Sequence, residues 1–252
     1  MATFVNGSDG LVNGYGTPVC RAQLGYVKSA ETATQVSYTL GVYIYCIRYG
    51  YTTSGVLSAA LSCSGQSSKS VSGMGCDIDP DQRAQLIANT VYTFNKTTSA
   101  WTPTIGFSCA STGSSVHGTS TGTFKPTIPA LQSYAVTYNA NGGTGTLDPG
   151  TKYYGQDLTL SSGVGLTRPH YTLKGWNTAA DGSGTHYDLG GLYTANEAIT
   201  LYAEWELDAI VTKCKVNGAW QEGIIYAKVN GEWVIPYVGY VKVNGEWKEI
   251  EV

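Results

Sequence analysis

One short motif carries the spacing of a catalytic nucleophile. The segment GTSTG, Gly118 to Gly122, satisfies the G-x-S-x-G pattern, which needs a strand, a sharp turn and then a helix to aim its serine. The segment that follows, TFKPTIPAL, alternates in polarity and is interrupted by proline, so no helix can begin there. We therefore interpret Ser120 as part of a surface strand rich in Thr and Ser, and we predict no catalytic residue.

A second motif imitates half of a calcium loop. An EF-hand loop that began at DIDPDQ, Asp77 to Gln82, would need glycine at its sixth position and glutamate at its twelfth, where the chain has Gln82 and Ala88. Pro80 favours a solvated turn between strands, and an irregular Ca²⁺ site is the alternative. We predict no metal ligands and no cofactor.

Histidines and paired acids complete the chemical inventory. The histidines are far apart in sequence and none has a partner at metal-ligand spacing, so we expect surface or turn positions. They are His117, His170 and His186. Glu204 and Glu206 share a face of one strand, which we interpret as its wet side and not as a carboxylate pair for glycosidic cleavage. The sequence therefore predicts a protein that is not an enzyme.

The segments KVNGAW, KVNGEW and KVNGEW repeat near the end of the chain. In each, Asn-Gly predicts a type I′ turn between two short strands, and counting outward from the turn places lysine opposite tryptophan. The lysine stem can then lie on the indole, a contact worth about 0.5 to 1 kcal/mol. The predicted binding residues are Lys215, Lys228, Lys242, Trp220, Trp233, Trp247, Tyr226 and Tyr240. The alternative is that these tryptophans only cement hairpin packing.

The composition indicates strands and tight turns. Charged residues make up 13% of the chain, against about 25% in ordinary domains, and there are 32 Gly and 19 Tyr. A net charge of -3 provides no basic field, so we predict no nucleic-acid partner. The first residues, MATFVNGSDGLVNG, lack the features of a signal peptide, and no apolar run is long enough to cross a membrane. We expect a soluble chain without membrane insertion.

Six cysteines occur without a C-x-x-C pair or metal spacing. They are Cys20, Cys46, Cys63, Cys76, Cys109 and Cys214. In the run VSYTLGVYIYCI, Cys46 shares a face with Val36, Leu40 and Ile44, which suits a buried thiol. We predict buried thiols for most of them, with one or more disulfides as the alternative.

The first predicted module spans residues 1–130. It contains alternating runs separated by turn signals, at 18–27, 34–47, 55–63, 70–76, 84–95, 103–111 and 118–126. Strands at this spacing predict an antiparallel β-sandwich. Two sets of residues are expected on one face of their strand: Leu57, Ala59, Leu61 and Cys63, and then Leu86, Ala88, Tyr92 and Phe94. Two prolines at 126–133 predict a linker.

The second predicted module, residues 134–206, contains the ordered motifs YNANGG, YGQDLTL, LTRPHYTLKGW, ADGSGTHY and ITLYAEW. This set resembles the Listeria–Bacteroides repeat, the internalin B-type repeat, over nearly its whole length. The resemblance implies a small β-grasp-like fold. His170 stands where the family has glycine, which puts the local turn geometry in doubt, and Leu173 replaces a phenylalanine.

Two further stretches resemble minor structural proteins of tailed phages. NTVYTFNKTTSAW, followed by FKPTIPALQSYAVTYNANGG, is similar to the junction at which an immunoglobulin-like domain leads into this repeat. The hairpins at 210–252, the third predicted module, resemble tandem hairpins at the ends of such proteins. The fold class is therefore expected to be all-β, with an immunoglobulin-like sandwich, a B-repeat and tandem hairpins.

These resemblances imply a non-enzymatic component of a phage virion, in the tail, a fibre or a surface decoration. Its expected partners are other virion proteins, further copies of itself, and a glycan or protein of the host cell surface. It would be made in the host cytoplasm and exposed on the particle. The alternatives are a bacterial surface adhesin and a module that binds carbohydrate or cell wall.

Overall fold

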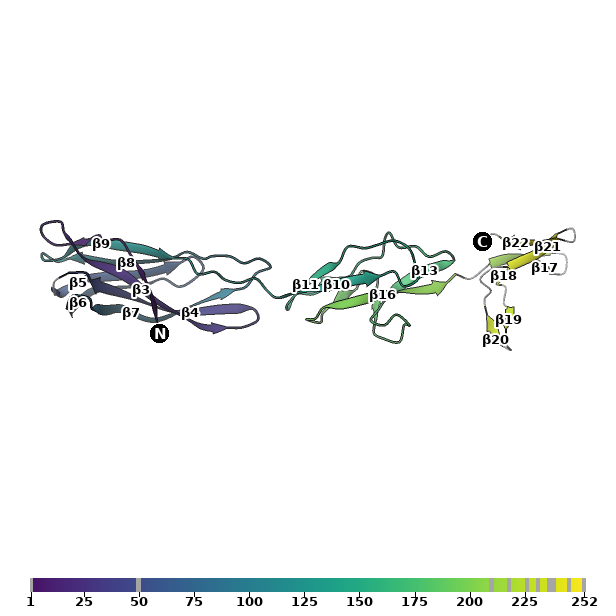
Figure 1. The fold of residues 1–252 in the computed structure, drawn as a ribbon, viewed down its shortest axis with the longest axis horizontal. Helices are drawn as coiled ribbons and strands as arrows, with labels where there is room; N and C mark the ends of the chain where they lie inside the picture. The colour runs from purple at the N-terminus through teal and green to yellow at the C-terminus, as the bar shows by residue number, and fades with distance from the viewer. Residues whose placement is uncertain are drawn as a thin grey trace. The chain divides into compact units, whose positions relative to one another are not determined.

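The computed structural model describes residues 2–48 and 51–208, and the strands within 211–250 (Figure 1). The chain divides into two compact units, Met1–Gln132 and Ser133–Val252. This boundary falls at the end of the linker predicted at 126–133. The all-β prediction is confirmed, because the described elements are strands. No helix in the described part of the chain is long and apolar enough to cross a membrane.

Nine strands build the first unit. They are β1 (Thr3–Asn6), β2 (Leu11–Val12), β3 (Pro18–Glu31), β4 (Gln35–Cys46), β5 (Tyr51–Cys63), β6 (Lys69–Ile78), β7 (Arg83–Asn95), β8 (Ile105–Thr112) and β9 (His117–Phe124). All seven predicted strands are present as β3 to β9, while the short β1 and β2 were not predicted. The sheet order is β6-β5-β8-β9-β2-β3-β4-β7, with β1 paired to β3.

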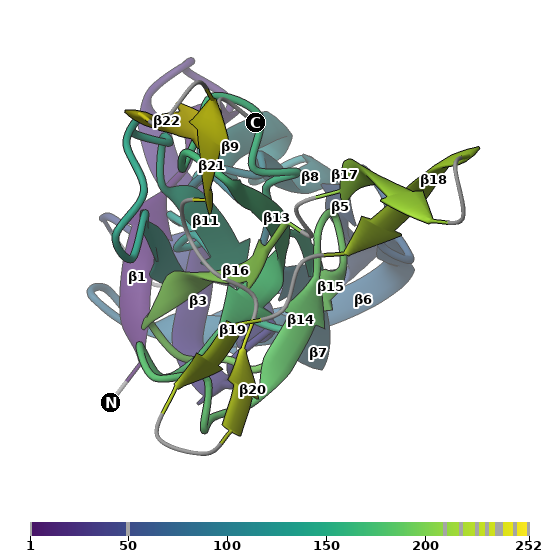
Figure 2. The same cartoon turned by 90° about the vertical axis from the view of Figure 1, so that its right-hand side faces the viewer.

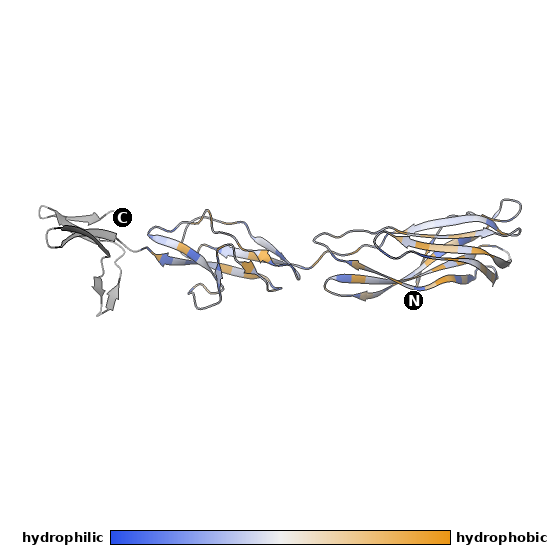
Figure 3. Cartoon of the chain, turned by 180° about the vertical axis from the view of Figure 1, so that it is seen from behind, coloured by the Kyte–Doolittle hydropathy of each residue, from blue (hydrophilic) through white to orange (hydrophobic). Residues whose placement is uncertain are grey.

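This sheet bends over on itself into a sandwich. Strands β3, β4 and β7 form one layer against β9, β8, β5 and β6, an order in which the chain crosses between layers as in immunoglobulin-like sandwiches. Hydrophobic and polar residues alternate along the strands (Figure 3). The hydrophobic ones form the core between the two layers. Along β4, every second side chain from Val36 to Cys46 is at most 8% exposed. The predicted buried face of this strand is therefore confirmed.

The predicted inward face of β7 is wrong at one residue, because the strand is bulged there. The residues predicted to face inward from β5 are all buried. On β7, Leu86, Tyr92 and Phe94 are buried, but Ala88 is exposed. Asn89 has a positive φ of 48°, and the β4–β7 register shifts twice, between Leu40 and Val42 and between Val42 and Tyr43. Between the two shifts Val42 pairs with Ile87, so Ile87 is buried and Ala88 turns outward.

Ser120 is buried, which contradicts the prediction of a surface strand position. It lies on β9 as predicted, but its side chain has no exposed surface. Its hydroxyl accepts a hydrogen bond of 2.8 Å from the backbone N–H of Ala22 and donates one to the carbonyl of Ser8. Strand pairing between β9, β2 and β3 brings these segments together, and the hydroxyl satisfies the N–H of Ala22, which would otherwise be buried without a partner.

The second unit contains a mixed sheet. Its strands are β10 (Ser133–Asn139), β11 (Gly150–Tyr153), β12 (Leu158–Thr159), β13 (Tyr171–Asn177), β14 (His186–Asp188), β15 (Leu192–Tyr193) and β16 (Ile199–Leu207). The order is β11-β10-β16-β13-β14, with β12 paired separately to β15. The first and last strands, β10 and β16, are parallel neighbours at its centre. This arrangement agrees with the β-grasp-like prediction.

Two turn signals of this unit have different outcomes. The stretch KYYGQDLTL, predicted as one strand, is divided into β11 and β12 by a turn in which Gly155 has a φ of +70°. His170 adopts a φ of +63°, so the turn does require the conformation that glycine accepts most easily. Because histidine has a Cβ atom, this left-handed backbone conformation is less favourable for His170 than it would be for glycine.

The core of the unit includes one buried charge. Trp176, Tyr193 and Leu201 have no exposed surface, and neither has Lys152. The Lys152 ammonium donates to the carbonyl of Tyr153 at 2.8 Å and to Oδ1 of Asn196 at 2.9 Å. The same Asn196 oxygen accepts from the N–H of Gly155. These bonds fasten the turn after β11 to the segment that precedes β16.

The last strands form three two-stranded ribbons, seen separately in Figure 2. They are β17 (Val211–Val216) with β18 (Ala219–Ile224), β19 (Ala227–Val229) with β20 (Glu232–Val234), and β21 (Gly239–Val243) with β22 (Glu246–Ile250). The three predicted hairpin pairings are present. That residues 210–252 form a module of their own stays a prediction.

The buried hydroxyl of Ser120 gives a test of the sandwich. We expect Ser120→Ala to lower the free energy of unfolding by about 1–3 kcal/mol, because it leaves the buried N–H of Ala22 without a partner and removes the bond to the part-buried carbonyl of Ser8. Thr119→Ala, at an exposed position of the same strand, should change it by less than about 0.5 kcal/mol. Urea unfolding of both variants measures the difference. Equal stability of the two would show that the Ser120 bonds contribute nothing.

Candidate functional site

The three hairpins repeat one cross-strand pair. Lys215 is the Cα partner of Trp220. The same register recurs in the next two hairpins, as Lys228 with Trp233 and Lys242 with Trp247. The pairing expected from a two-residue turn is therefore confirmed at the level of the backbone. That the lysine and tryptophan side chains of each pair meet on one face stays a prediction.

The structure describes only some of the other residues predicted to bind ligand in the hairpins. Tyr240 lies in β21 as the partner of Glu249. Tyr226 lies outside the described residues, and so do the three Asn-Gly pairs predicted to form the type I′ turns. The predicted binding roles of Tyr226, Tyr240 and the Lys–Trp pairs stay predictions.

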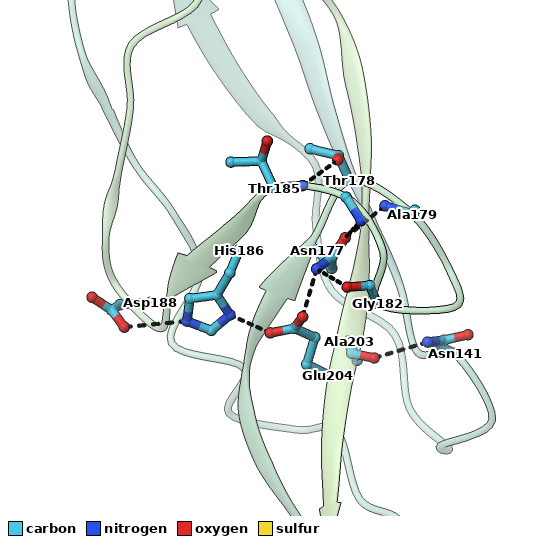
Figure 4. A network of polar contacts seen from close by, with 11 residues as sticks. Asn141, Asn177, Thr178, Ala179, Gly182, Thr185, His186, Asp188, Ala203 and Glu204 are labelled. Atoms are coloured by element: carbon cyan, nitrogen blue, oxygen red, sulfur yellow. Dashed lines mark hydrogen bonds and ion pairs between the residues drawn. The ribbon is translucent and has the colours of Figure 1, made fainter.

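A second candidate site, in the described part of the mixed sheet, centres on the buried side chain of Asn177, at the end of β13 (Figure 4). Its amide nitrogen donates to the carbonyl of Gly182 at 3.1 Å and to Oε1 of Glu204 at 2.6 Å. Its oxygen accepts from the N–H groups of Ala179, at 2.9 Å, and Gly184, at 3.0 Å. One side chain thus holds the turn of ADGSG against β16.

His186 joins this network from β14 (Figure 4). Its Nδ1 contacts Oε2 of Glu204, and its Nε2 lies 3.4 Å from Oδ1 of Asp188. The hydrogen bond to Glu204 raises the pKa of His186 above its ordinary value, and Asp188 adds to the effect, while partial desolvation opposes it. The imidazole is half exposed, so solvent screens the pair.

The two acids of β16 differ in environment, which corrects the prediction that both belong to a wet face. Glu206 is exposed and forms an ion pair with Lys174 at 2.9 Å. The side chain of Glu204 is only 24% exposed and binds both Asn177 and His186. Sequence reasoning missed this cluster because its members are supplied by three different strands. The one feature of the sequence that could have indicated the cluster is the spacing of His186 and Asp188, which places both side chains on the same face of β14.

A cavity of about 390 Å³ adjoins the network. Its lining residues are Asn141, Arg168, Ala180, Asp181, Gly182, Ala203, Glu204 and Trp205. The Arg168 guanidinium lies 3.8 Å from the ring centroid of Tyr171, whereas Asp181 accepts hydrogen bonds from Ser183. The cavity therefore presents a cation, two carboxylates and an indole, a set that can hold a small polar group.

The remaining sequence motifs have structural roles. The DIDPDQ segment forms the end of β6 and the turn before β7, as predicted. In this turn Oδ1 of Asp81 accepts a hydrogen bond from the hydroxyl of Tyr45 at 2.7 Å. His117, at the start of β9, is exposed. Within the described residues, no three His, Cys, Asp or Glu side chains gather in a way that could hold a metal ion.

Comparison with known families identifies the mixed-sheet domain. Residues 134–204 match the family model of the Listeria–Bacteroides repeat domain. These residues are a Listeria–Bacteroides repeat domain. The match covers strands β10 to β16 except for Ser133 and the last residues of β16. The Asn177 network therefore lies within the matched residues, and so do all the residues that line the cavity except Trp205.

Two similar proteins come from Evansella cellulosilytica. One, named a putative Gly-rich membrane protein, is 33% identical over 79 residues, which are 31% of this chain and 9% of that protein. The other, named a putative membrane protein, is 35% identical over 79 residues, 30% of this chain and 12% of its own length. The chain thus spans about a tenth of these relatives. No solved structure matches it.

The His186 contacts predict a pH dependence of the repeat domain. Its pKa is higher in the folded than in the unfolded state, where it is near 6.5, so the folded domain binds the proton more tightly. The resulting stabilisation is complete below pH 6.5 and is lost as the pH rises through the folded pKa. Urea unfolding followed at several pH values should show this loss.

In the variant His186→Gln, the free energy of unfolding should no longer fall as the pH rises from 6.5 through the folded pKa of His186. His117→Gln, which changes an exposed histidine of the other unit, should retain the wild-type dependence. If His186→Gln kept the wild-type dependence of stability on pH, His186 would not be the group responsible for it.

Proposed function

We propose that this protein is a non-enzymatic structural component of a tailed-phage virion, in the tail, a fibre or a surface decoration, and that it contributes to attachment to the bacterial cell surface. The observation that carries the attachment role is the Lys–Trp pair that recurs in the same register in three hairpins. Placement in a virion is supported by the resemblance of the junction before the repeat domain, and of the hairpins, to phage structural proteins.

The proposed mechanism is multivalent binding. Each Lys–Trp pair combines an apolar ring face with a cation, which suits sugar rings and the anionic groups of a cell envelope. A single exposed pair of this kind contributes little, about 0.5 to 1 kcal/mol. Three pairs in one chain, multiplied over the copies in a symmetric particle, can still give firm attachment without any one strong contact.

A bacterial surface protein is the second candidate. It is favoured by one observation, the names of the two similar Evansella cellulosilytica proteins, both called putative membrane proteins. Those names apply to proteins of which this chain matches only about a tenth. A module that binds carbohydrate is a further alternative. It would use the same tryptophans, but it need not be part of a phage particle.

Particle composition tests the virion proposal. We expect mass spectrometry of density-purified phage particles to detect this protein at a constant ratio to the major tail or capsid protein. Immunogold labelling of the same particles should place it at one fixed position. Its absence from purified particles, together with recovery from the envelope of uninfected cells, would instead establish the surface-protein alternative.

Substitution of the tryptophans tests the attachment role. In the full chain, the combined change of Trp220, Trp233 and Trp247 to Ala should weaken binding to isolated host cell walls on the order of tenfold or more, because all three aromatic contacts are lost. A sedimentation assay measures bound and unbound protein, and a glycan array identifies any sugar ligand.

The hairpins supply a matched control. Ala219 occupies in the first hairpin the position that Glu232 and Glu246 hold in the others, so changing both acids to Ala copies a natural repeat. This control should bind like the wild type, with circular dichroism verifying that all variants fold. Wild-type binding by the triple tryptophan variant would show that the tryptophans serve only to pack the hairpins.

A further inference from the structure

Two cysteines face each other across neighbouring strands of the sandwich. Cys20 on β3 and Cys46, the last residue of β4, are Cα partners. Both backbone polar groups of Cys46 bond away from β3: its N–H donates to the carbonyl of Gln82 at 3.1 Å, and its carbonyl accepts from Asp81 at 3.0 Å. The two cysteines therefore occupy a non-hydrogen-bonded position of the antiparallel ladder.

This position has the right spacing for a cross-link. Opposed residues at non-hydrogen-bonded positions have Cα atoms about 4.5 Å apart, within the range of about 4.4 to 6.8 Å that disulfides span. The side chains of Cys20 and Cys46 are 1% and 0% exposed, and Sγ of Cys46 donates a hydrogen bond to the carbonyl of Arg48 at 2.8 Å. Both thiols thus belong to the core, at directly opposed positions of neighbouring strands.

The ladder positions of the other described cysteines face residues of other types. Cys63 lies opposite Ile105, Cys109 opposite Ala59 and Ser120, and Cys76 opposite Thr53. Register therefore distinguishes one pair from the remaining described cysteines.

We propose that Cys20 and Cys46 are a site of disulfide formation, which closes when the chain meets a small disulfide oxidant such as oxidised glutathione. The thiolate of one cysteine attacks the oxidant and releases one glutathione thiolate, leaving a mixed disulfide. The second protein thiolate then displaces the other glutathione. The protein loses two electrons and two protons, and the oxidant becomes two thiols.

Burial determines when this reaction can occur. It raises the pKa of Cys20 to about 12, and it also raises the pKa of Cys46, so the folded pair holds almost no thiolate at neutral pH. The exchange therefore proceeds while β3 and β4 are folding or transiently open. Once formed, the buried bond is protected from reducing agents by the same packing. A chain made in a reducing cytoplasm would keep its thiols until it leaves that compartment.

The test uses the full chain refolded from denaturant with oxidised glutathione or with dithiothreitol. After remaining thiols are alkylated, digestion without reduction and mass spectrometry should yield one peptide that links Cys20 to Cys46. The cross-link closes a long loop, so the oxidised protein should have a melting temperature higher on the order of 10 °C, and dithiothreitol added during unfolding should abolish the difference.

Variants separate this pair from other thiols. Cys20→Ala and Cys46→Ala should each lose the linked peptide and the shift in melting temperature, whereas Cys63→Ser should retain both. A disulfide between other cysteines, a linked protein that melts at a lower temperature, or complete alkylation of Cys20 and Cys46 after oxidative refolding would overturn the proposal. None of these outcomes depends on whether the protein is found in phage particles.

Discussion

Burial of alternate residues along the central strands is the constraint on which the first unit depends. A chain with only 13% charged residues cannot rely on surface ion pairs, and its strands must place one apolar face against another. Strand β4 does this over its whole length, pairing with β3 on one side and β7 on the other. The alternation is interrupted on β7 near Asn89, where register shifts against β4 turn Ala88 outward, and it resumes at Tyr92 and Phe94, which are buried.

Buried polar groups in both units are satisfied by partners distant in sequence. Ser120 joins β9 to the segments around Ser8 and Ala22, and Asn177 joins a turn to β16. In each case one side chain completes hydrogen bonds that backbone or carboxylate groups would lack inside the protein. These polar contacts fix where irregular segments sit, whereas the hydrophobic faces fix the sheets. Lys152 has the same role in the repeat domain, bound entirely by oxygens of a carbonyl and an amide.

The function proposed here follows from repetition. The Listeria–Bacteroides repeat domain supplies a small sheet with a polar network at one end, and the hairpins supply the same Lys–Trp pair three times. Repeated weak contacts need a scaffold that holds its shape, and antiparallel sheets provide it because their backbone groups are paired along the whole ladder. The Cys20–Cys46 site would add a covalent link to that scaffold outside the cytoplasm.

The sequence by itself predicted seven strands of the first unit, a linker at 126–133, the repeat domain and the backbone pairing of each lysine with a tryptophan. These features depend on local patterns: period-two alternation, Asn-Gly turns and motif order. At His170 the sequence left the turn geometry open, and the structure shows a positive φ there.

Only the tertiary structure decided the bulge that exposes Ala88, the burial of Ser120, the contact of His186 with Glu204 and the opposition of Cys20 to Cys46. The physical reason is that each depends on register between segments far apart in the chain. A shift of one residue in that register would turn every side chain to the other face, and the sequence pattern of one strand does not specify its neighbour.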